Sequence, residues 1–296
     1  MSDDRRVTIS VGIPVCNGAK TIARAIESIQ KQTFKNISVI ISNNASTDDT
    51  RKICLQKING DARFLYTEHS TNIEALLNFK SIFRYVTTDY FVFLAADDYW
   101  EPEFLELNLK NLIENETAVA SVSKIFYDSL NKENKYDLDG GYPIKGDIFT
   151  RLKKYFEHPL DNSRFYSLFK SEVIKKSFEK AHHSHAWDWY IMAMTLCHGE
   201  HLRVDRYLMH REITENYKYH ESVIVDNKNH FSGLLFPIWP MSFYFLKEAP
   251  LLLKFKIFPA LIKLNIEKHM EFIAYKSQMR HFLCNSYCKF LYRLFR

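Results

Sequence analysis

The sequence predicts an α/β fold in which helices flank a mostly parallel β-sheet. Strand-like and helix-like segments alternate four times over roughly the first hundred residues, which is the pattern of right-handed βαβ units. The strand-like segments are almost continuously apolar, as strands covered on both faces are. The chain has 296 residues, of which 46% are hydrophobic and 15% aromatic, with only 8 Gly and 8 Pro. This composition excludes a disordered or fibrous chain and is sufficient for a large core.

The elements follow one another in a regular order. The first strand, VTISVGIPV at 7–15, is rich in β-branched residues and is followed by the breaker Asn17-Gly18. The next segment places apolar residues at the spacing of one helix face: Ile22, Ala25, Ile26 and Ile29. Further strands are expected at 37–44, 63–68, 90–96, 118–128 and 201–210. Helices are expected after a cap at Ser46 or Thr47, at 73–86, from Pro102 onward, and at 146–157, 171–181 and 186–199.

Polar residues follow three of the expected strands. These strand exits are residues 14–17, residues 43–48 and the adjacent pair Asp97 and Asp98. Parallel strands end at the same edge of a sheet, and ligands of open α/β folds bind at that edge. We therefore expect the three exits to form one site.

Two adjacent carboxylates at the end of a buried strand repel each other unless a cation compensates them. Hard oxygen ligands on one side of a cleft suit Mg²⁺ or Mn²⁺, which complete their coordination with water and substrate phosphates. The alternative is a helix start, in which Asp98 caps the helix and Glu101 and Glu103 interact with its dipole. The two neighbouring polar exits favour the metal site.

Three segments carry a resemblance to a known family. They are VTISVGIPVCNGAKTIARAIESIQKQTF, ISVIISNNASTDDT and YFVFLAADDYWEPEFLE, in this order and spacing. Residues 7–115 therefore resemble the family 2 glycosyltransferases, which have the Rossmann-like GT-A fold. In that family the first strand usually ends in Ile-Pro-x-x-Asn and the second in an acidic or amide stretch before Ser-Thr-Asp. The fourth strand ends in a metal-binding motif of the Asp-x-Asp type.

The resemblance implies that the strand exits bind a nucleoside-diphosphate sugar. The positions that match the nucleotide pocket and its base-binding part are Pro14, Val15 and Asn17, then Asn43 and Asn44. Asn72 and Asn78 fall where the family has polar residues near the donor. Asp97 and Asp98 match the metal motif and would hold Mn²⁺ or Mg²⁺ against the diphosphate. Two residues at the end of the closing strand would approach that diphosphate: His210 and Arg211.

A later segment, AWDWYIMAMTLCHGEHLRVDRYLMHRE, is similar to the acceptor side of the same family. There an Asp at the start of a helix acts as the catalytic base, which makes Asp188 the candidate here. Trp187 and Trp189 would form a platform for a sugar, although they suit a protein core equally well. Tyr166 would also face the acceptor.

These roles describe an inverting, metal-dependent glycosyltransferase. One carboxylate deprotonates the acceptor hydroxyl as it attacks the anomeric carbon, and a cation stabilises the departing nucleoside diphosphate. The resemblance favours a UDP-sugar as donor. It implies a growing surface glycan or a lipid-linked saccharide as acceptor.

Three positions depart from the family pattern. Cys16 stands where an aromatic residue is common. Ala95 stands where the metal motif usually has an acid, and Asn43 stands where an acid usually meets the base. These departures keep open a second hypothesis, a catalytically degenerate subunit that binds sugar nucleotides or glycans. A nucleotidyltransferase is less consistent, because IPVCNGAK lacks a Gly-rich loop with Arg and Lys. A nicotinamide dehydrogenase is disfavoured, because no GxGxxG follows the first strand.

The composition changes after residue 225. We expect a catalytic domain over 1–225 and a basic, aromatic-rich α-helical extension over 226–296. The segment 247–296 contains ten Lys and Arg but three Glu, in a chain of net charge +5. Amphipathic helices of this kind suit an anionic membrane surface, and packing on the main domain or on a partner subunit is the alternative. Nucleic-acid binding is disfavoured, because the aromatic residues lie at helical spacing among aliphatic ones.

No segment indicates export or membrane crossing. MSDDRRVTIS lacks the regions of a signal peptide, and no stretch of about 18 uncharged apolar residues occurs. Five scattered cysteines suit free thiols in a reducing compartment. His182, His183 and His185 suit a solvated surface better than a metal cluster. We expect a cytoplasmic protein that the extension attaches to the inner face of the cell membrane, and the oligomeric state stays open.

Overall fold

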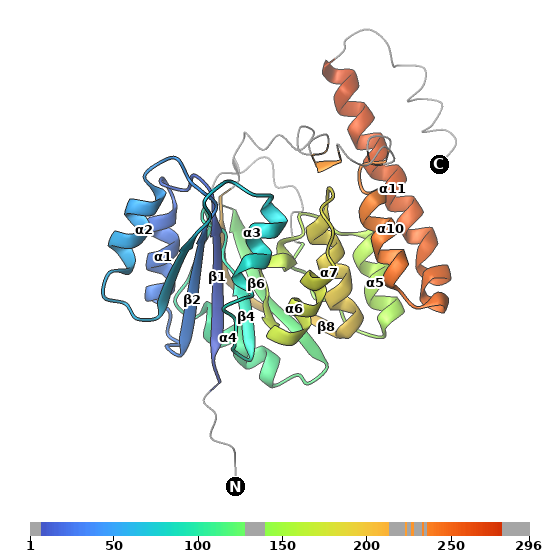
Figure 1. The fold of residues 1–296 in the computed structure, drawn as a ribbon. Coiled ribbons are helices and arrows are strands. Elements are labelled where there is room, and N and C mark those ends of the chain that lie inside the picture. The colour runs from blue at the N-terminus through green and yellow to red at the C-terminus, as the bar shows by residue number, and fades with distance from the viewer. Residues whose placement is uncertain are drawn as a thin grey trace.

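The structure is a computed structural model that describes residues 7–127, 140–212, 223, 226–227, 233 and 236–279. Its centre is a twisted sheet with helices on both sides (Figure 1). Within the described residues the sheet has eight strands, in the order β3-β2-β1-β4-β7-β6-β8-β5. The strands are β1 (Ile9–Val15), β2 (Ile37–Asn43), β3 (Phe64–Glu68), β4 (Tyr90–Phe93), β5 (Tyr99–Trp100), β6 (Ala118–Tyr127), β7 (Leu168–Lys170) and β8 (Glu200–Arg211).

Helices connect the strands and follow the last one. The first part of the chain contributes α1 (Ile22–Gln30), α2 (Thr50–Ile58), α3 (Ala75–Ile82) and α4 (Phe104–Ile113). The middle of the chain contributes α5 (Ile148–Glu157), the short 3₁₀ helix η1 (Ser163–Tyr166), α6 (Ser171–Glu179) and α7 (Trp187–His198). The C-terminal helices are α10 (Trp239–Glu248) and α11 (Leu251–Met279).

Strand pairing confirms the predicted fold class. β1 pairs in parallel with both β2 and β4, β2 pairs in parallel with β3, and β6 pairs in parallel with β8. The short strands β7 and β5 run antiparallel to their neighbours. The long strands therefore finish at one end of the sheet, and loops from distant parts of the sequence meet there.

Successive strand residues alternate between two cores, because side chains point to opposite faces along a strand. Val92 packs in the core that α1, α2 and α4 cover, whereas Phe91 and Phe93 pack in the core that the remaining long helices cover. Gly12 faces this second core. A Cβ at this position would lie 2.9 Å from both Phe91 and Ile82. The absence of a side chain at residue 12 therefore allows the phenyl ring to pack directly on β1.

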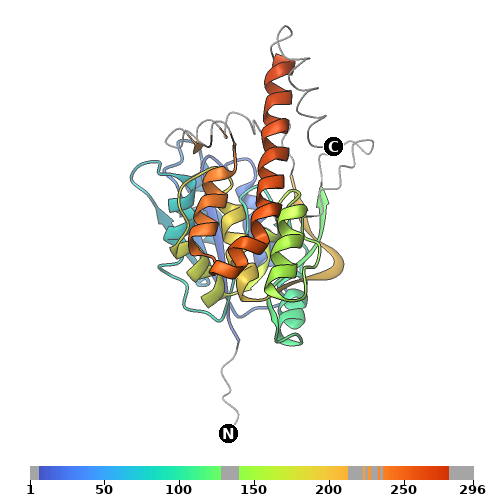
Figure 2. The same ribbon diagram turned by 90° about the vertical axis from the view of Figure 1, so that its right-hand side faces the viewer.

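The C-terminal helices pack on the rest of the protein. Figure 2 shows α11 lying beside α5, with α10 on the other side of α11. Met241 and Phe245 of α10 and Ile257 and Leu261 of α11 are fully buried and belong to the same core as α5 and α7. Packing, which was the alternative in the sequence analysis, thus accounts for the buried apolar residues of the described part of the extension. No helix within the described ranges is both long and apolar enough to cross a membrane.

Two helix starts differ from their predictions. Neither Ser46 nor Thr47 caps α2, which begins at Thr50. Asp48 instead bends the chain before the helix, because its Oδ1 accepts a hydrogen bond from the backbone N–H of Thr50 at 3.0 Å. Helix α4 begins at Phe104, so Pro102 precedes the helix and does not lie in its first turn.

The predicted strand 90–96 is shorter than expected. β4 ends at Phe93, and a turn follows in which the backbone N–H of Asp98 donates to the carbonyl of Ala95 at 3.1 Å. The chain then enters β5, which pairs with β8 and was not predicted. This turn holds Asp97 and Asp98 at the end of the sheet.

Candidate functional site

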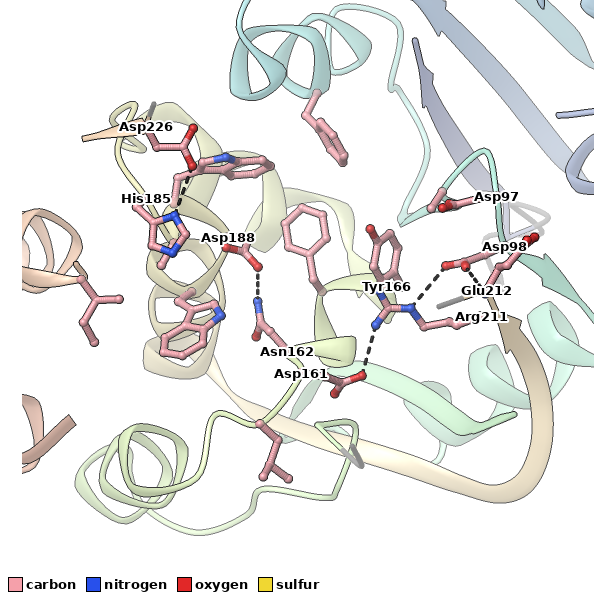
Figure 3. Close-up of a pocket in the computed structure, with 18 of the residues that line it drawn as sticks. Asp97, Asp98, Asp161, Asn162, Tyr166, His185, Asp188, Arg211, Glu212 and Asp226 are labelled. Carbon is pink, nitrogen blue, oxygen red and sulfur yellow. Dashed lines mark hydrogen bonds and ion pairs between the residues drawn. The ribbon is translucent and has the colours of Figure 1, made fainter. Parts of the chain in front are cut away.

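A cavity of about 600 Å³ opens where β4, β6 and β8 finish. Its walls come from the turn after β4, the loop before η1, the start of α7 and the end of β8 (Figure 3). Six acidic residues line it: Asp97, Asp98, Asp161, Asp188, Glu212 and Asp226. One arginine, Arg211, lies among them. The cavity is therefore suited to a cation or to hydroxyl groups and is poorly suited to a bare anion.

Asp97 and Asp98 form one wall of this cavity. Asp98 is 2% exposed, and its Oδ1 accepts a hydrogen bond from the backbone N–H of Glu212 at 3.4 Å. Nε of Arg211 lies 3.5 Å from Oδ2 of the same carboxylate. Arg24 donates to the backbone carbonyl of Asp97 at 2.8 Å and fixes the turn from outside.

The electrostatics of Asp98 suit a cation. Burial raises its pKa to about 7, and Arg211 only partly opposes this rise. Among the described residues, none donates a hydrogen bond to Oδ2 of Asp98. In that same part of the chain, no three His, Cys, Asp or Glu side chains gather as a metal-ligand group. The protein thus offers two carboxylates, which fit a Mg²⁺ or Mn²⁺ ion that takes its other ligands from water and a diphosphate.

Asp188 lies in the opposite wall, in the first turn of α7. Its Oδ2 accepts a hydrogen bond of 2.7 Å from the side-chain amide of Asn162. Burial raises the pKa of Asp188, and the amide of Asn162 opposes that rise. A carboxylate with a raised pKa at the edge of a cavity can take a proton from a hydroxyl more readily than an ordinary surface aspartate.

The aromatic residues predicted on the acceptor side lie in the same wall. Trp187 packs edge-on against Phe79 and Phe165, with ring centroids 5.3 and 5.6 Å apart. Trp189 lies under Lys268, whose Nζ is 5.8 Å from the ring centroid. Both tryptophans line the cavity while they pack against the core. The platform and core interpretations are therefore compatible.

The two residues at the end of β8 point in different directions. Arg211 faces the cavity, where its guanidinium lies 5.1 Å from the ring centroid of Tyr166 and its Nη1 lies 3.2 Å from Oδ2 of Asp161. His210 does not line the cavity. It stacks on Tyr99, with ring centroids 4.3 Å apart, and its Nε2 lies 2.8 Å from a carboxylate oxygen of Glu101.

The histidine cluster was predicted to be a solvated surface, and this prediction is wrong for His185. His182 is exposed and stacks on Tyr244, whereas Nδ1 of His183 lies 3.3 Å from Glu74. His185 is buried and lines the cavity, with Nδ1 3.2 Å from Oδ2 of Asp226. Asp226 lies far along the chain, so local spacing could not have indicated this contact.

The first and second strand exits are joined by hydrogen bonds. Asn17, in the left-handed region with φ 54°, donates its backbone N–H to Oγ of Ser46 and accepts at Oδ1 from the backbone N–H of Thr47, both at 2.8 Å. Pro14 and Val15 are buried within β1. Asn17 is therefore the exposed member of this group of predicted residues.

The amides predicted near the base and the donor differ in accessibility. Asn43 is fully buried, and it donates to Tyr66 at 2.9 Å and accepts from the backbone N–H of Ser46 at 3.2 Å. The structure places three further amides nearby. Asn44 is buried and bonds to the backbone of Ile73, Asn78 is buried and bonds to Ser42, and Asn72 is exposed with its Nδ2 3.2 Å from Sγ of Cys16. Asn72 is the amide of this set that solvent reaches.

Sequence reasoning missed residues in both parts of the site. Arg51 and Glu68 form an ion pair of 2.9 Å and line a second, open depression beside the first two strand exits. Glu68 is the last residue of β3, so the rule that selected the other strand exits could have found it. Asp161 and Asn162 lie in an irregular loop, where no periodicity was available to indicate them.

A family model described as Glycosyl transferase family 2 matches residues 10–178. The chain belongs to this family. The matched segment contains Asp97, Asp98 and the loop with Asn162. Asp188 lies beyond the matched segment.

Curated relatives share only part of their length with the chain. Glycosyltransferase GlyA of Streptococcus pneumoniae is 28% identical over 169 residues, which are 56% of this chain and 22% of GlyA. The UDP-Glc:alpha-D-GlcNAc-diphosphoundecaprenol beta-1,3-glucosyltransferase WfaP of Escherichia coli is 30% identical over 138 residues, which are 47% of this chain and 49% of WfaP. The chain thus spans less than half the length of these relatives.

Solved structures share the fold over most of the chain. TarS 1-349 of S. aureus in complex with UDP-GlcNAc superposes with a TM-score of 0.58 at 14% identity, covering 88% of this chain and 81% of TarS 1-349. The mannosyltransferase PcManGT of Pyrobaculum calidifontis, in complex with GDP-Man and Mn²⁺, gives a TM-score of 0.54 at 15% identity, covering 96% of this chain and 82% of PcManGT. These likenesses show the GT-A fold.

Proposed function

We propose that the chain is an inverting, metal-dependent glycosyltransferase with a nucleoside-diphosphate sugar as donor. Its acceptor is the hydroxyl of a growing surface glycan or of a lipid-linked saccharide. Residues 1–225 form the catalytic domain in this proposal, and residues 226–296 form the helical extension. The observation that carries the proposal is the placement of Asp188 across one cavity from Asp97 and Asp98.

Asp188 is the acid in the cavity that is best placed to act as a general base. Three other acids already have a basic partner: Asp161 with Arg211 at 3.2 Å, Glu212 with Arg24 at 2.9 Å and Asp226 with His185 at 3.2 Å. Asp188 instead accepts a hydrogen bond from the neutral amide of Asn162. A neutral donor orients the carboxylate without cancelling its charge, so Asp188 keeps its basicity.

An inverting mechanism needs a single general base, because the acceptor oxygen displaces the leaving group in one step. The acceptor hydroxyl gives its proton to Asp188 while its oxygen attacks the anomeric carbon on the face opposite the leaving nucleoside diphosphate. A Mg²⁺ or Mn²⁺ ion held by Asp97 and Asp98 would supply electrostatic stabilisation of the diphosphate charge. Arg211, which bridges Asp98 and Asp161, contributes a fixed positive charge on the same side.

The donor is expected to be a UDP-sugar. WfaP is named for a transfer from UDP-Glc, and TarS 1-349 was solved with UDP-GlcNAc. The exposed side chains around the first strand exits, Asn17, Asn72 and the Arg51–Glu68 pair, are the candidates for contacts with the nucleotide. The buried amide Asn43 is a less suitable candidate, because its hydrogen bonds already hold the loop after β2.

The acceptor end that enters the cavity is expected to be uncharged. Six acids and one arginine line the cavity, so a carboxylate or phosphate on the reacting sugar would be repelled. WfaP is named for a diphosphoundecaprenol-linked GlcNAc acceptor. A lipid-linked acceptor suits this cavity when its neutral sugar, and not its diphosphate, lies beside Asp188.

Membrane contact is proposed for one part of the extension. Exposed apolar side chains gather around the turn between α10 and α11, and we call this group the apolar corner. It consists of Phe243, Leu251, Leu252, Phe255 and Phe258. These side chains are between 45% and 78% exposed. Lys247, Lys254 and Lys256 alternate with them along the chain. Apolar side chains flanked by lysines are typical of a surface that binds anionic lipid.

The test combines donor binding with turnover. UDP-GlcNAc, UDP-Glc and GDP-Man are added to the protein with and without Mn²⁺, and binding is followed by thermal shift while nucleotide release is followed by a coupled assay. We expect a UDP-sugar to stabilise the protein in the presence of the ion and to be hydrolysed slowly. Asp188→Asn should keep the thermal shift and lose turnover by a factor of about 10² to 10⁴.

The outcomes separate the two hypotheses. Donor binding without turnover on water or on any saccharide acceptor would favour the catalytically degenerate binding subunit, which the absence of an acid at Ala95 motivates. If no nucleotide sugar stabilises the protein, the proposed donor is wrong.

A further inference from the structure

Asp188 is held by a chain of hydrogen bonds that starts in the core. The hydroxyl of Tyr155, which is fully buried, donates to Oδ1 of Asn162 at 2.8 Å. Nδ2 of Asn162 then donates to Oδ2 of Asp188 at 2.7 Å. Figure 3 shows the second of these bonds crossing from the loop before η1 to the start of α7. An ionised carboxylate only accepts hydrogen bonds, so the amide nitrogen of Asn162 has to face Asp188.

The backbone that presents Asn162 is strained and tightly held. Leu160 and Asn162 both adopt left-handed conformations, with φ 53° and 52°, and Ala186 on the facing segment has φ 60°. Between them, Oδ1 of Asp161 accepts from the backbone N–H of Gly140 at 2.9 Å. A Cβ at residue 140 would lie 2.3 Å from that oxygen. Left-handed non-glycine residues persist only where the surroundings determine them, and they concentrate at functional sites.

We propose that Asn162, oriented by Tyr155, is a positioning residue that fixes the carboxylate of Asp188 as a general base. The proposal rests on the function assigned to Asp188 above. Asn162 is 3% exposed and lies within hydrogen-bond distance of that carboxylate, so its amide supplies a donor that is fixed before the substrate arrives. A lysine or arginine in its place would hold the carboxylate equally well but would lower its basicity.

Other charged groups near Asp188 do not replace this contact. His185 lies beside it in the same wall but is paired with Asp226. Arg211 is paired with Asp98 and Asp161, and Nζ of Lys268 lies over the ring of Trp189, 5.8 Å from its centroid. These charged groups act on Asp188 only through longer-range electrostatic interactions, whereas Asn162 donates a hydrogen bond directly to its carboxylate.

The decisive experiment measures the acidic limb of the pH–rate profile. Nucleotide release from UDP-GlcNAc with Mn²⁺ is followed in the wild type, Asn162→Ala, Asn162→Asp and Tyr155→Phe. Loss of a hydrogen bond to a charged acceptor should move the acidic limb of Asn162→Ala upward by about one to two pH units. The shift should be larger in Asn162→Asp, which adds a like charge, and smaller in Tyr155→Phe, which only frees the amide.

A second readout does not depend on turnover. Aspartate labelled with ¹³C at the side-chain carboxyl is titrated by NMR, and the signal of Asp188 is identified by its absence from Asp188→Asn. The titration midpoint should shift in the same order among the variants. If the wild type turns over no donor, the proposed function fails, while this titration still tests whether Asn162 controls Asp188.

The matched control is a buried amide outside the cavity. Asn108 is fully buried and accepts from Ser121 at 2.8 Å, so Asn108→Ala also removes a buried hydrogen bond. It should lower the thermal midpoint without moving the acidic limb. If Asn162→Ala behaves in the same way, with an unchanged limb and an unchanged titration midpoint, the positioning role is refuted.

Discussion

At the scale of single residues, the chemistry of the site depends on which group each acidic side chain faces. Asp98 faces Arg211, Asp161 is held by the same arginine, and Asp188 faces a neutral amide. Each partner determines what its acid can do. Arg211 opposes the rise that burial causes in the pKa of Asp98, whereas Asp188, which faces a neutral amide, is a buried carboxylate with a raised pKa that can take a proton.

The pH dependence of the reaction should reflect Asp188. Burial raises the pKa of this group above its ordinary value of about 3.9. A base must be ionised, so kcat should fall with unit slope as the pH falls through the raised pKa. The measurement is kcat for nucleotide release across pH 4 to about 9 at two saturating concentrations of Mn²⁺. A limb that moves with the concentration of the ion would belong to its ligands and would contradict this assignment.

The metal ligands should be separable from other acids at the same end of the sheet. Asp98→Asn keeps the shape of the side chain but removes the charge that a divalent ion needs. We expect the additional thermal stabilisation by Mn²⁺ in the presence of UDP to disappear in Asp98→Asn and to weaken in Asp97→Asn. Glu101→Gln, whose carboxylate pairs with His210 outside the cavity, should retain it. Equal losses in all three variants would refute the predicted metal site.

At the scale of elements, the sequence predicted the helices and strands whose apolar residues recur at a regular spacing. Helix α1 buries the four residues that the spacing selected, and the apolar run of β1 is fully buried. Element ends were less predictable, because they depend on single turns such as the Ala95–Asp98 hydrogen bond. The expectation that ligands bind where strands end placed Asp97 and Asp98 at the end of the sheet, and both residues line the cavity there. It could not give the direction of a side chain, which is why Asn43 was predicted to meet a base but lies buried.

The loop before η1 illustrates what the sequence could not provide. Asp161 and Asn162 follow no period, and their roles depend on left-handed backbone at Leu160 and Asn162 and on contact with Gly140. These contacts join segments that are more than twenty residues apart in the chain. They are products of tertiary packing, so a single sequence gives no local signal for them.

The C-terminal helices should unfold together with the catalytic core. Phe245 of α10 is fully buried and packs edge-on against Phe156 of α5, with ring centroids 5.2 Å apart. Phe245→Ala should lower the free energy of unfolding by about 3 to 5 kcal/mol in a single denaturation transition. Phe243→Ala, two positions earlier but 54% exposed, should change it by less than about 0.5 kcal/mol. A separate early transition in Phe245→Ala would mean that the extension folds independently.

At the scale of the whole molecule, the apolar corner should determine membrane binding. We expect the protein to sediment with vesicles that contain phosphatidylglycerol, less with pure phosphatidylcholine, and less again at high salt. Leu252→Ser combined with Phe255→Ser should abolish this binding. Leu77→Ser, which changes an exposed leucine of α3 elsewhere on the surface, is the matched control and should retain it. Concentration-dependent self-association that is lost in the double variant would instead assign the corner to a second copy of the chain.

The apolar corner and the cavity lie toward opposite ends of the molecule. The turn between α10 and α11 is near the end from which β1 starts, whereas the cavity opens where the parallel strands finish (Figure 1). Helix α7 carries Asp188 in its first turn and runs 12 residues away from the cavity, which is about 18 Å. An enzyme resting on a bilayer by this corner would hold its base well above the lipid headgroups. Such an enzyme would select its acceptor by length, because only a lipid-linked glycan long enough to span that height could bring its terminal hydroxyl to the base.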